Sequence, residues 1–275
     1  MGPSAYTAER APELAVRRAR GQRDPAPAER TVRKRAIPAS TAGAPAAGSG
    51  PAVELHDIHQ RFGRKRVLRG VDLSVSPGST LVLVGSNGAG KTTLLRIIAT
   101  LLRPSRGEGT VDGLSIREQG DQIRARSAYV SARGFVYDDL TAAENLRFGA
   151  RLAGANLTDA RVGELLGEVG LDHVADQTVR TFSTGMRRRL ALAGLRLRPL
   201  RLALIDEPYA ALDDEGMALV DRLVMDLVDG GTTVILASHQ SGEATRRATR
   251  TLRLDEGRLV EAASDLAALP TPEAS

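Results

Sequence analysis

Hydrophobic positions change their period several times along residues 53–261, and each change marks a predicted element. Leu81 to Val84 form a short continuous apolar run, which is typical of a fully buried strand, and Gly85 ends it. The apolar residues at positions 94, 95, 97 and 98 then follow the spacing of a helix. Residues 80–98 are therefore predicted to form a strand, a glycine loop and a helix in that order.

The flanking segments extend this pattern. Alternating residues in VELHDI and VLRGVDLSV predict antiparallel strands, closed by Pro77 and Gly78. Residues 116–126 predict a polar helical connection, residues 128–130 a strand, and residues 140–170 helices, the first opened by a capping box of Thr141 and Glu144. Apolar runs at 202–205 and 233–237 predict two more buried strands, and residues 251–261 a closing hairpin.

Composition separates the ends from this patterned region. Residues 1–50 hold six prolines, many alanines and few large apolar residues, so we expect a disordered tail; residues 263–275 form a second tail. The first 50 residues carry nine basic and four acidic side chains, which accounts for the whole formal net charge of +5. The rest of the chain is neutral, so its charge gives no reason to expect nucleic acid. The basic tail could contact an anionic membrane, although an inert extension is favoured.

Three absences narrow the class of protein. The chain has no cysteine, which excludes disulfides and thiolate metal sites. No apolar stretch is long enough to span a bilayer, and no apolar core follows the N-terminus, so we expect neither a membrane span nor a secretory signal.

The glycine loop fits the pattern G-x-x-x-x-G-K-[ST], which binds a nucleoside triphosphate. Small residues let backbone N–H groups approach the phosphates, and the following helix adds unpaired N–H groups and the positive end of its dipole. The lysine is expected to reach the β- and γ-phosphates and the next hydroxyl to ligate Mg²⁺. A plain glycine-rich turn is the alternative. The predicted nucleotide-binding residues of the loop are Gly85, Ser86, Asn87, Gly88, Ala89, Gly90, Lys91, Thr92 and Thr93.

Polar residues follow two of the other predicted strands. Asp206 and Glu207 end one strand and His239 closes another, and carboxyl ends of parallel strands meet at one edge of a sheet. Asp206 is then placed to hold Mg²⁺, Glu207 to orient or deprotonate the attacking water, and His239 to stabilise the γ-phosphate. Phe62, on the loop between the first two strands, is a candidate for stacking on adenine, with an aromatic that only covers the sheet as the alternative.

In this order and spacing, GSNGAGKTT, FSTGM, LALIDEP, AALDD and SH resemble the Walker A, signature, Walker B, D-loop and switch-histidine segments of ABC transporter nucleotide-binding subunits. The resemblance covers residues 53 to about 261 and is closest to the ATPase of the cytochrome c maturation haem exporter. It implies an α/β fold of the P-loop NTPase class: an ABC-type cassette over residues 51–262 with a mainly parallel core sheet, an N-terminal antiparallel β-subdomain and a helical subdomain at about 134–195.

The resemblance also implies partners. Two such subunits, alike or different, face each other, so that Ser183 and Gly185 of one contact the ATP held by Lys91 of the other, with Asp213 across the interface and Phe62 on the adenine. ATP and Mg²⁺ are the implied cofactors. Closing and opening of the pair drives separate transmembrane subunits, which places the chain in the cytoplasm at the inner face of the cell membrane.

Two positions depart from the family pattern. Thr184 adds a β-branched side chain where the family has glycine, which we expect to weaken closure without abolishing it. The family's loop glutamine, which contacts Mg²⁺ and water, falls on Ala132 or Arg133, and neither residue can replace it. Arg133 could supply charge to the γ-phosphate, although a solvated loop arginine is the favoured interpretation.

The sequence thus favours the ATP-hydrolysing subunit of a transporter, with haem as one cargo and lipid, drug or polysaccharide as others. An ATP-gated regulatory protein with weak hydrolysis is the main alternative. A soluble translation or repair ATPase is disfavoured, because those proteins usually carry two cassettes or a long coiled coil.

Overall fold

The computed structural model describes residues 50–131, 136–238 and 248–261, all within one compact unit of the chain. These residues build two sheets. The first is antiparallel with strand order β2-β1-β4-β5, formed by β1 (Val53–Phe62), β2 (Lys65–Val75), β4 (Arg106–Val111) and β5 (Leu114–Ser115). The second has the order β10-β9-β3-β8-β7-β6, formed by β3 (Thr80–Val84), β6 (Ser127–Val130), β7 (Leu202–Asp206), β8 (Thr233–Ala237), β9 (Arg250–Asp255) and β10 (Arg258–Glu261).

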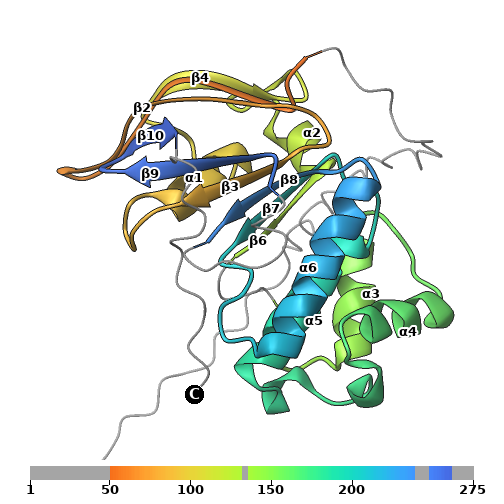
Figure 1. Cartoon of the computed structure of the whole chain (residues 1–275). Coiled ribbons are helices and arrows are strands. Elements are labelled where there is room, and N and C mark those ends of the chain that lie inside the picture. The colour runs from red at the N-terminus through yellow and green to blue at the C-terminus, as the bar shows by residue number, and fades with distance from the viewer. Residues whose placement is uncertain (1–49, 132–135, 239–247, 262–275) are drawn as a thin grey trace, which may run out of the picture. The chain divides into compact units, whose positions relative to one another are not determined.

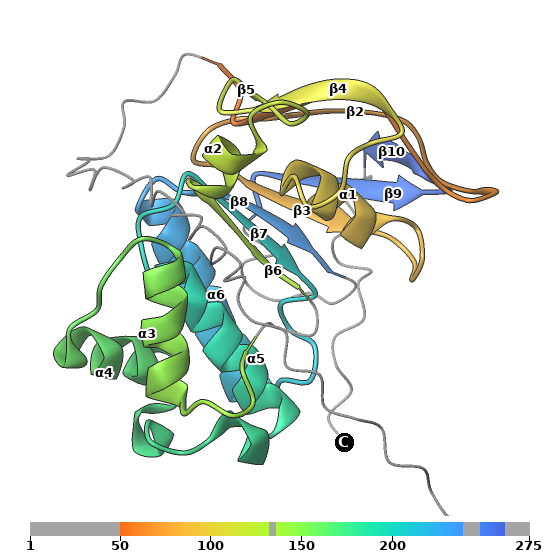
Figure 2. The same cartoon turned by 180° about the vertical axis from the view of Figure 1, so that it is seen from behind.

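Helices cover both faces of the second sheet. They are α1 (Lys91–Ile98), α2 (Gly120–Arg124), α3 (Ala142–Leu152), α4 (Asp159–Glu168), α5 (Thr184–Ala193) and α6 (Asp214–Asp229), with short 3₁₀ turns at Asp172–Val174, Val179–Thr181 and Gly194–Arg196. Figures 1 and 2 show α1 between the two sheets and α3 to α6 on the other side of the parallel strands. None of the helices in the described part of the chain is long and apolar enough to cross a membrane.

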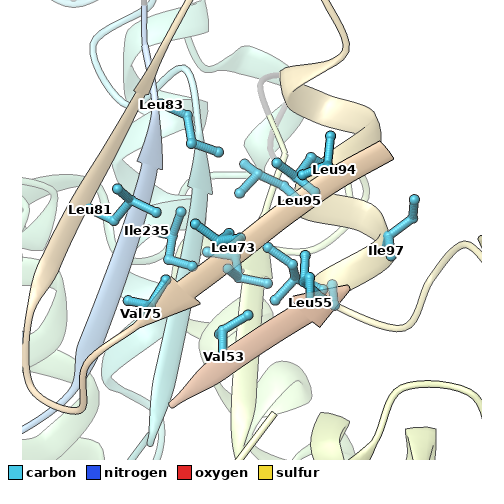
Figure 3. Close-up of a cluster of buried hydrophobic side chains, with 14 of the residues drawn as sticks. Val53, Leu55, Leu73, Val75, Leu81, Leu83, Leu94, Leu95, Ile97 and Ile235 are labelled. Carbon is cyan, nitrogen blue, oxygen red and sulfur yellow. The ribbon is translucent and has the colours of Figure 1, made fainter. Parts of the chain in front are cut away.

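The central core joins the two sheets through α1. Figure 3 shows side chains of β1 and β2 facing those of β3, β8 and α1, among them Leu55, Leu73, Leu83 and Leu95, all less than 5% exposed. Because both faces of the parallel strands are covered, every residue of β3, β7 and β8 is buried, and these strands appear in the sequence as continuous apolar runs.

The second and third hydrophobic clusters lie beyond the parallel sheet. Val82 and Val84 of β3 point to the face opposite Leu81 and Leu83, where they pack with residues of α5 and α6. The helices α3, α4 and α5 then share a cluster of their own, with Leu219 of α6 at its border. Thus α1 and α5 lie on opposite faces of one sheet, an arrangement that follows from side-chain alternation along each strand.

The structure confirms the predicted α/β class, the antiparallel first sheet and the mainly parallel second sheet. The structure differs from the sequence predictions in individual elements and residues. Phe62 is the last residue of β1, paired with Lys65, and not a loop residue, because the turn is only two residues long. The helical connection shrinks to α2, and the longest helix, α6, was not anticipated. The proposed domain boundaries stay predictions, and the predicted tails lie outside the described residues apart from Gly50.

The capping box of α3 is confirmed. The Thr141 hydroxyl accepts the Glu144 N–H at 3.1 Å, and the Glu144 carboxylate accepts the Thr141 N–H at 2.9 Å. We expect Thr141→Ala to lower the free energy of unfolding by about 1 kcal/mol, because an N-terminal N–H of the helix loses its acceptor. Denaturant unfolding measures this change. Thr158→Ala, which removes the α4 cap without a reciprocal carboxylate, is the comparison and should cost less; equal stability of Thr141→Ala and wild type would contradict the expectation.

Candidate functional site

The phosphate loop connects the end of β3 to the start of α1, as predicted. Its first glycine, Gly85, has φ 152°, and a Cβ there would lie 2.4 Å from the Leu254 carbonyl oxygen, so only glycine fits. Gly90 has φ 113° and packs against Val67 and Leu68 of β2. Residues 86–88 between them are exposed, and nothing lies within 4 Å of the Cβ position of Gly88. The loop therefore presents its backbone in open space, where a phosphate can approach.

Lys91 begins α1 at the base of this loop. Its side chain is only 6% exposed, and its ammonium donates to the carbonyl oxygens of Gly85 at 2.7 Å and Ser86 at 3.4 Å. The same nitrogen lies 3.7 Å from a carboxylate oxygen of Glu207. Because Gly90 has no side chain, it cannot cap the first-turn N–H groups of α1, which stay available to an anion. A cation and several backbone donors thus converge on one small volume.

Thr92 of α1 and Asp206 of β7 are in contact although they are 114 positions apart in the chain. The Thr92 hydroxyl donates to Asp206 Oδ2 at 2.7 Å, and the Tyr129 hydroxyl donates to the same oxygen at 3.3 Å. Asp206 is 1% exposed, and its Oδ1 is buried without a hydrogen-bond partner among the described residues. A buried carboxylate oxygen with spare acceptor capacity, next to a hydroxyl, fits a hard cation. Burial and the Asp206 carboxylate raise the pKa of Tyr129, against an opposing effect of Arg96.

This donor set fits Mg²⁺ better than an all-protein metal centre. No group of three or more His, Cys, Asp or Glu side chains is gathered for a metal within residues that the structure describes. Mg²⁺ in nucleotide sites is usually held by one or two protein ligands together with phosphate oxygens and water. Thr92 and Asp206 therefore match a cation that arrives with a nucleotide.

Glu207 follows the end of β7 in a strained conformation. Its φ is 52°, in the left-handed region that non-glycine residues rarely adopt. Its N–H donates to the Ala237 carbonyl oxygen at 2.7 Å, which ties it to the end of β8. Since β3, β8 and β7 are parallel neighbours, their carboxyl ends lie at one edge, as the sequence predicted. His239, predicted at this edge two residues beyond β8, lies outside the described residues.

Arg188 is a residue that the sequence reasoning missed. It is 2% exposed, and its guanidinium donates to the carbonyl oxygens of Ser131, Asp206 at 2.6 Å and Glu207 at 2.8 Å. Burial lowers the pKa of Arg188 to about 10, and the nearby Asp206 and Glu207 carboxylates oppose that shift, so the side chain stays charged at neutral pH. Helical spacing could have revealed it, because position 188 lies four residues before the buried Leu192.

The remaining predicted residues lie at element ends. Ser183 is the N-cap of α5, exposed, and its hydroxyl accepts the Met186 N–H at 3.2 Å. Asp213 caps α6 by accepting the Gly216 N–H at 2.9 Å, so it already has a structural role. Gly185 lies close to the Ala211 carbonyl, with 3.0 Å between that oxygen and the glycine's Cβ position.

The three other predicted residues are Phe62, Ala132 and Arg133. Phe62, at the end of β1, is 51% exposed and so available to stack on a ligand. Ala132 and Arg133, the positions of the altered loop, lie outside the described residues.

Comparisons with known proteins agree with this geometry. The family model described as ABC transporter matches residues 68–210, more than half of the chain. The cytochrome c biogenesis ATP-binding export protein CcmA 2 of Cupriavidus metallidurans is 38% identical over 188 residues, which cover 68% of this chain and 89% of that protein. The daunorubicin resistance ATP-binding protein DrrA2 of Streptomyces coeruleorubidus is also 38% identical, over 77% of this chain and 66% of its own length.

Solved structures lead to the same family. An ATP-binding subunit of an ABC transporter superposes with a TM-score of 0.70 at 27% identity, covering 78% of this chain and 90% of the other. The dimeric post-hydrolysis state of the ATP-binding cassette MJ0796, bound to ADP and Pi, also gives a TM-score of 0.70, at 25% identity, covering 75% of this chain and 96% of the other. With the phosphate loop, the strand-end carboxylates and these matches together, the chain belongs to the ATP-binding subunits of ABC transporters.

Proposed function

We propose that this subunit hydrolyses ATP as one half of a pair and thereby drives separate transmembrane subunits at the inner face of the cell membrane. The observation that carries the proposal is the convergence of Lys91, Thr92, Asp206 and Glu207 at one edge of the parallel sheet. These groups match the requirements of phosphoryl transfer, in which positioning and charge stabilisation do most of the work.

Each side chain then has a distinct role. Lys91 moves its ammonium from the loop carbonyls to the β- and γ-phosphates, which are stronger acceptors because they are charged. Thr92 and Asp206 hold Mg²⁺, which when bound offsets the charge of the phosphates. Glu207 orients the attacking water and accepts its proton. His239 stabilises the γ-phosphate, and Phe62 stacks on the adenine.

The proposed pairing is supported by where the two segments assigned to nucleotide contact lie. The phosphate loop leads into α1 on one face of the parallel sheet, whereas Ser183 and Gly185 belong to α5 on the other face. A second copy or a close relative, turned to face the first, brings its Ser183 to the ATP held by Lys91. Asp213 then lies across the interface. Each site needs both subunits, so a single subunit is expected to turn over slowly.

The membrane partner needs a docking surface, and α3 offers one. Phe148 and Leu152 lie one turn apart on this helix and are 36% and 70% exposed. Tyr137 packs its ring edge to face on Phe148, with the centroids 4.8 Å apart, and is itself 42% exposed. We assign this apolar surface to a short cytoplasmic helix of the transmembrane subunit, which would bury it on assembly.

For the cargo we propose haem export in cytochrome c maturation, supported by relatives with cytochrome c biogenesis names in several bacteria. Drug export is the second candidate, because relatives named for daunorubicin resistance match at similar identity. Cargo contacts only the membrane subunit, so the discriminating experiment is to copurify that subunit and ask which compound, haem or an anthracycline, stimulates ATP hydrolysis.

Single-turnover hydrolysis tests the proposal itself. The full chain, mixed in excess over radiolabelled ATP and Mg²⁺, should convert the nucleotide to ADP and phosphate, and chelation of Mg²⁺ with EDTA should stop the reaction while ATP binding weakens less. Hydrolysis no faster than in protein-free buffer, with ATP-driven pairing intact, would instead support the ATP-gated regulatory protein that the altered loop at positions 132 and 133 suggests.

A further inference from the structure

Arg188 joins three segments that are far apart in the sequence. Its guanidinium, carried by α5, donates to a carbonyl at the end of β6 and to two consecutive carbonyls at the end of β7. The first acceptor, Ser131, directly follows β6 and precedes positions 132 and 133, and the other two are Asp206, the last residue of β7, and Glu207, which follows it. One side chain therefore connects the signature helix to the proposed catalytic edge.

The hydrogen bond from Arg188 constrains the backbone of Glu207 directly. This residue is held on both sides of its Cα: its N–H by Ala237 of β8 and its carbonyl by Arg188. With φ at 52°, its backbone persists in a rarely occupied conformation only because its surroundings maintain it. The guanidinium therefore helps to decide where the Glu207 carboxylate points, and that carboxylate lies 3.7 Å from the Lys91 ammonium.

A purely structural role explains this residue poorly. A buried guanidinium must give up its hydration, and its Nε–H has no acceptor among the residues that the structure describes. An apolar side chain at this position of α5 would avoid that desolvation. The charge is instead placed beside two carboxylates, where with Lys91 it offsets the negative charge of Asp206 and Glu207.

The N-terminal end of α5 carries Ser183. This residue is the N-cap of the helix, and Arg188 lies five residues further along it. An α-helix is a stiff element, so a displacement of the first turn of α5 also displaces the next turn, which carries Arg188. The Arg188 guanidinium would transmit that displacement to the three carbonyl groups that it contacts.

We propose that Arg188 is a positioning residue that couples the signature segment of a subunit to the catalytic carboxylate of the same subunit. When Ser183 contacts the nucleotide on the partner copy, α5 shifts, and Arg188 moves the backbone of Glu207 and of Ser131 with it. The two nucleotide sites of the pair are thereby linked through each chain. This inference rests on the proposed function, because it takes Ser183 as a contact across the pair and Glu207 as the residue that orients water.

Arg198 provides a matched control. It is also an arginine whose guanidinium donates to three backbone carbonyls, those of Arg124, Ala125 and Ser127, and burial lowers its pKa as well. However, these acceptors lie before and at the start of β6, at the opposite end of that strand from Ser131. Arg198→Gln therefore removes similar interactions without touching the catalytic edge.

The experiment compares Arg188→Gln, Arg188→Lys and Arg198→Gln in the full chain, with thermal unfolding, ATP affinity, kcat and the Hill coefficient for ATP as readouts. We expect Arg188→Gln to lower kcat by up to about 100-fold, the effect of misplacing a catalytic group by roughly 1 Å. ATP affinity of the separate subunit should stay within about threefold, because the Lys91 loop is untouched, and the Hill coefficient should fall towards 1. Arg188→Lys, which keeps the charge but not the fork of donors, should recover part of kcat.

The outcomes distinguish the coupling role of Arg188 from a purely structural role and from failure of the proposed function. Equal losses of kcat in Arg188→Gln and Arg198→Gln, or an unchanged Hill coefficient in Arg188→Gln, would overturn the inference and leave the proposed function standing. If Arg188→Gln does not fold, Arg188→Lys carries the test, and wild-type kcat and Hill coefficient in that variant would count against the coupling role. Absence of hydrolysis in the wild-type chain would refute the proposed function instead.

Discussion

Glu207→Gln lowers the rate of ATP hydrolysis by about 10²- to 10⁴-fold, the usual effect of losing a general base. The amide keeps the size and hydrogen-bonding geometry of the side chain but cannot accept the proton of the attacking water. The substitution also removes the negative charge 3.7 Å from the Lys91 ammonium, so ATP binding should be retained or strengthened. The variant should therefore accumulate as an ATP-bound pair, which size-exclusion chromatography with and without ATP and Mg²⁺ measures.

Glu164→Gln is the control for this result. Glu164 is an exposed residue of α4 that pairs with Arg161, so the same chemical change there should leave hydrolysis and pairing as in wild type. A Glu207→Gln chain that still hydrolyses ATP at the wild-type rate would remove Glu207 from the mechanism. A chain that neither hydrolyses nor pairs would count against the proposed ATP-driven closure.

Lys91→Ala weakens ATP binding by roughly 10- to 100-fold, which corresponds to the loss of about 1.5–3 kcal/mol from hydrogen bonds to a charged partner. Lys91 is the buried cation at the base of the loop, and its removal also leaves the Glu207 carboxylate facing the phosphates without that neighbouring charge. Equilibrium binding of a fluorescent ATP analogue, followed by competition with ATP, measures the change, and hydrolysis should fall at least in parallel.

Arg222→Ala controls for the loss of one positive charge, because Arg222 is exposed on α6, which packs on the other face of the parallel sheet. Its ATP affinity should equal that of wild type. Unchanged affinity in Lys91→Ala would show that the nucleotide is not bound through this loop, and the assignment of the site would fail.

Prediction from sequence worked best where a structural feature depends on neighbouring residues. The run Leu81–Val84, the glycines of the loop and the Thr141 capping box each specify local geometry through a few adjacent positions, and the structure has the predicted strand, loop and cap. The helix α6 was not predicted from the sequence, although Asp213 caps it and its buried residues at positions 219, 220, 223, 224 and 227 follow helical spacing. Phe62 was predicted to lie in the loop but is the last residue of β1, because only residues 63 and 64 of the polar segment RFGRKR form the turn.

The sequence by itself determined the phosphate loop, the strand-end carboxylates and the family, because short motifs with strict spacing report local geometry and ligand chemistry. Only the tertiary structure decided that Thr92 forms a hydrogen bond with Asp206, since β8 pairs with β7 on one side and, on the other, with β3, which lies more than a hundred positions earlier in the chain. It also decided which of the three consecutive arginines at 187–189 reaches the proposed catalytic edge: Arg188 lies on the buried face of α5, and its cationic side chain donates to carbonyls at the ends of two strands.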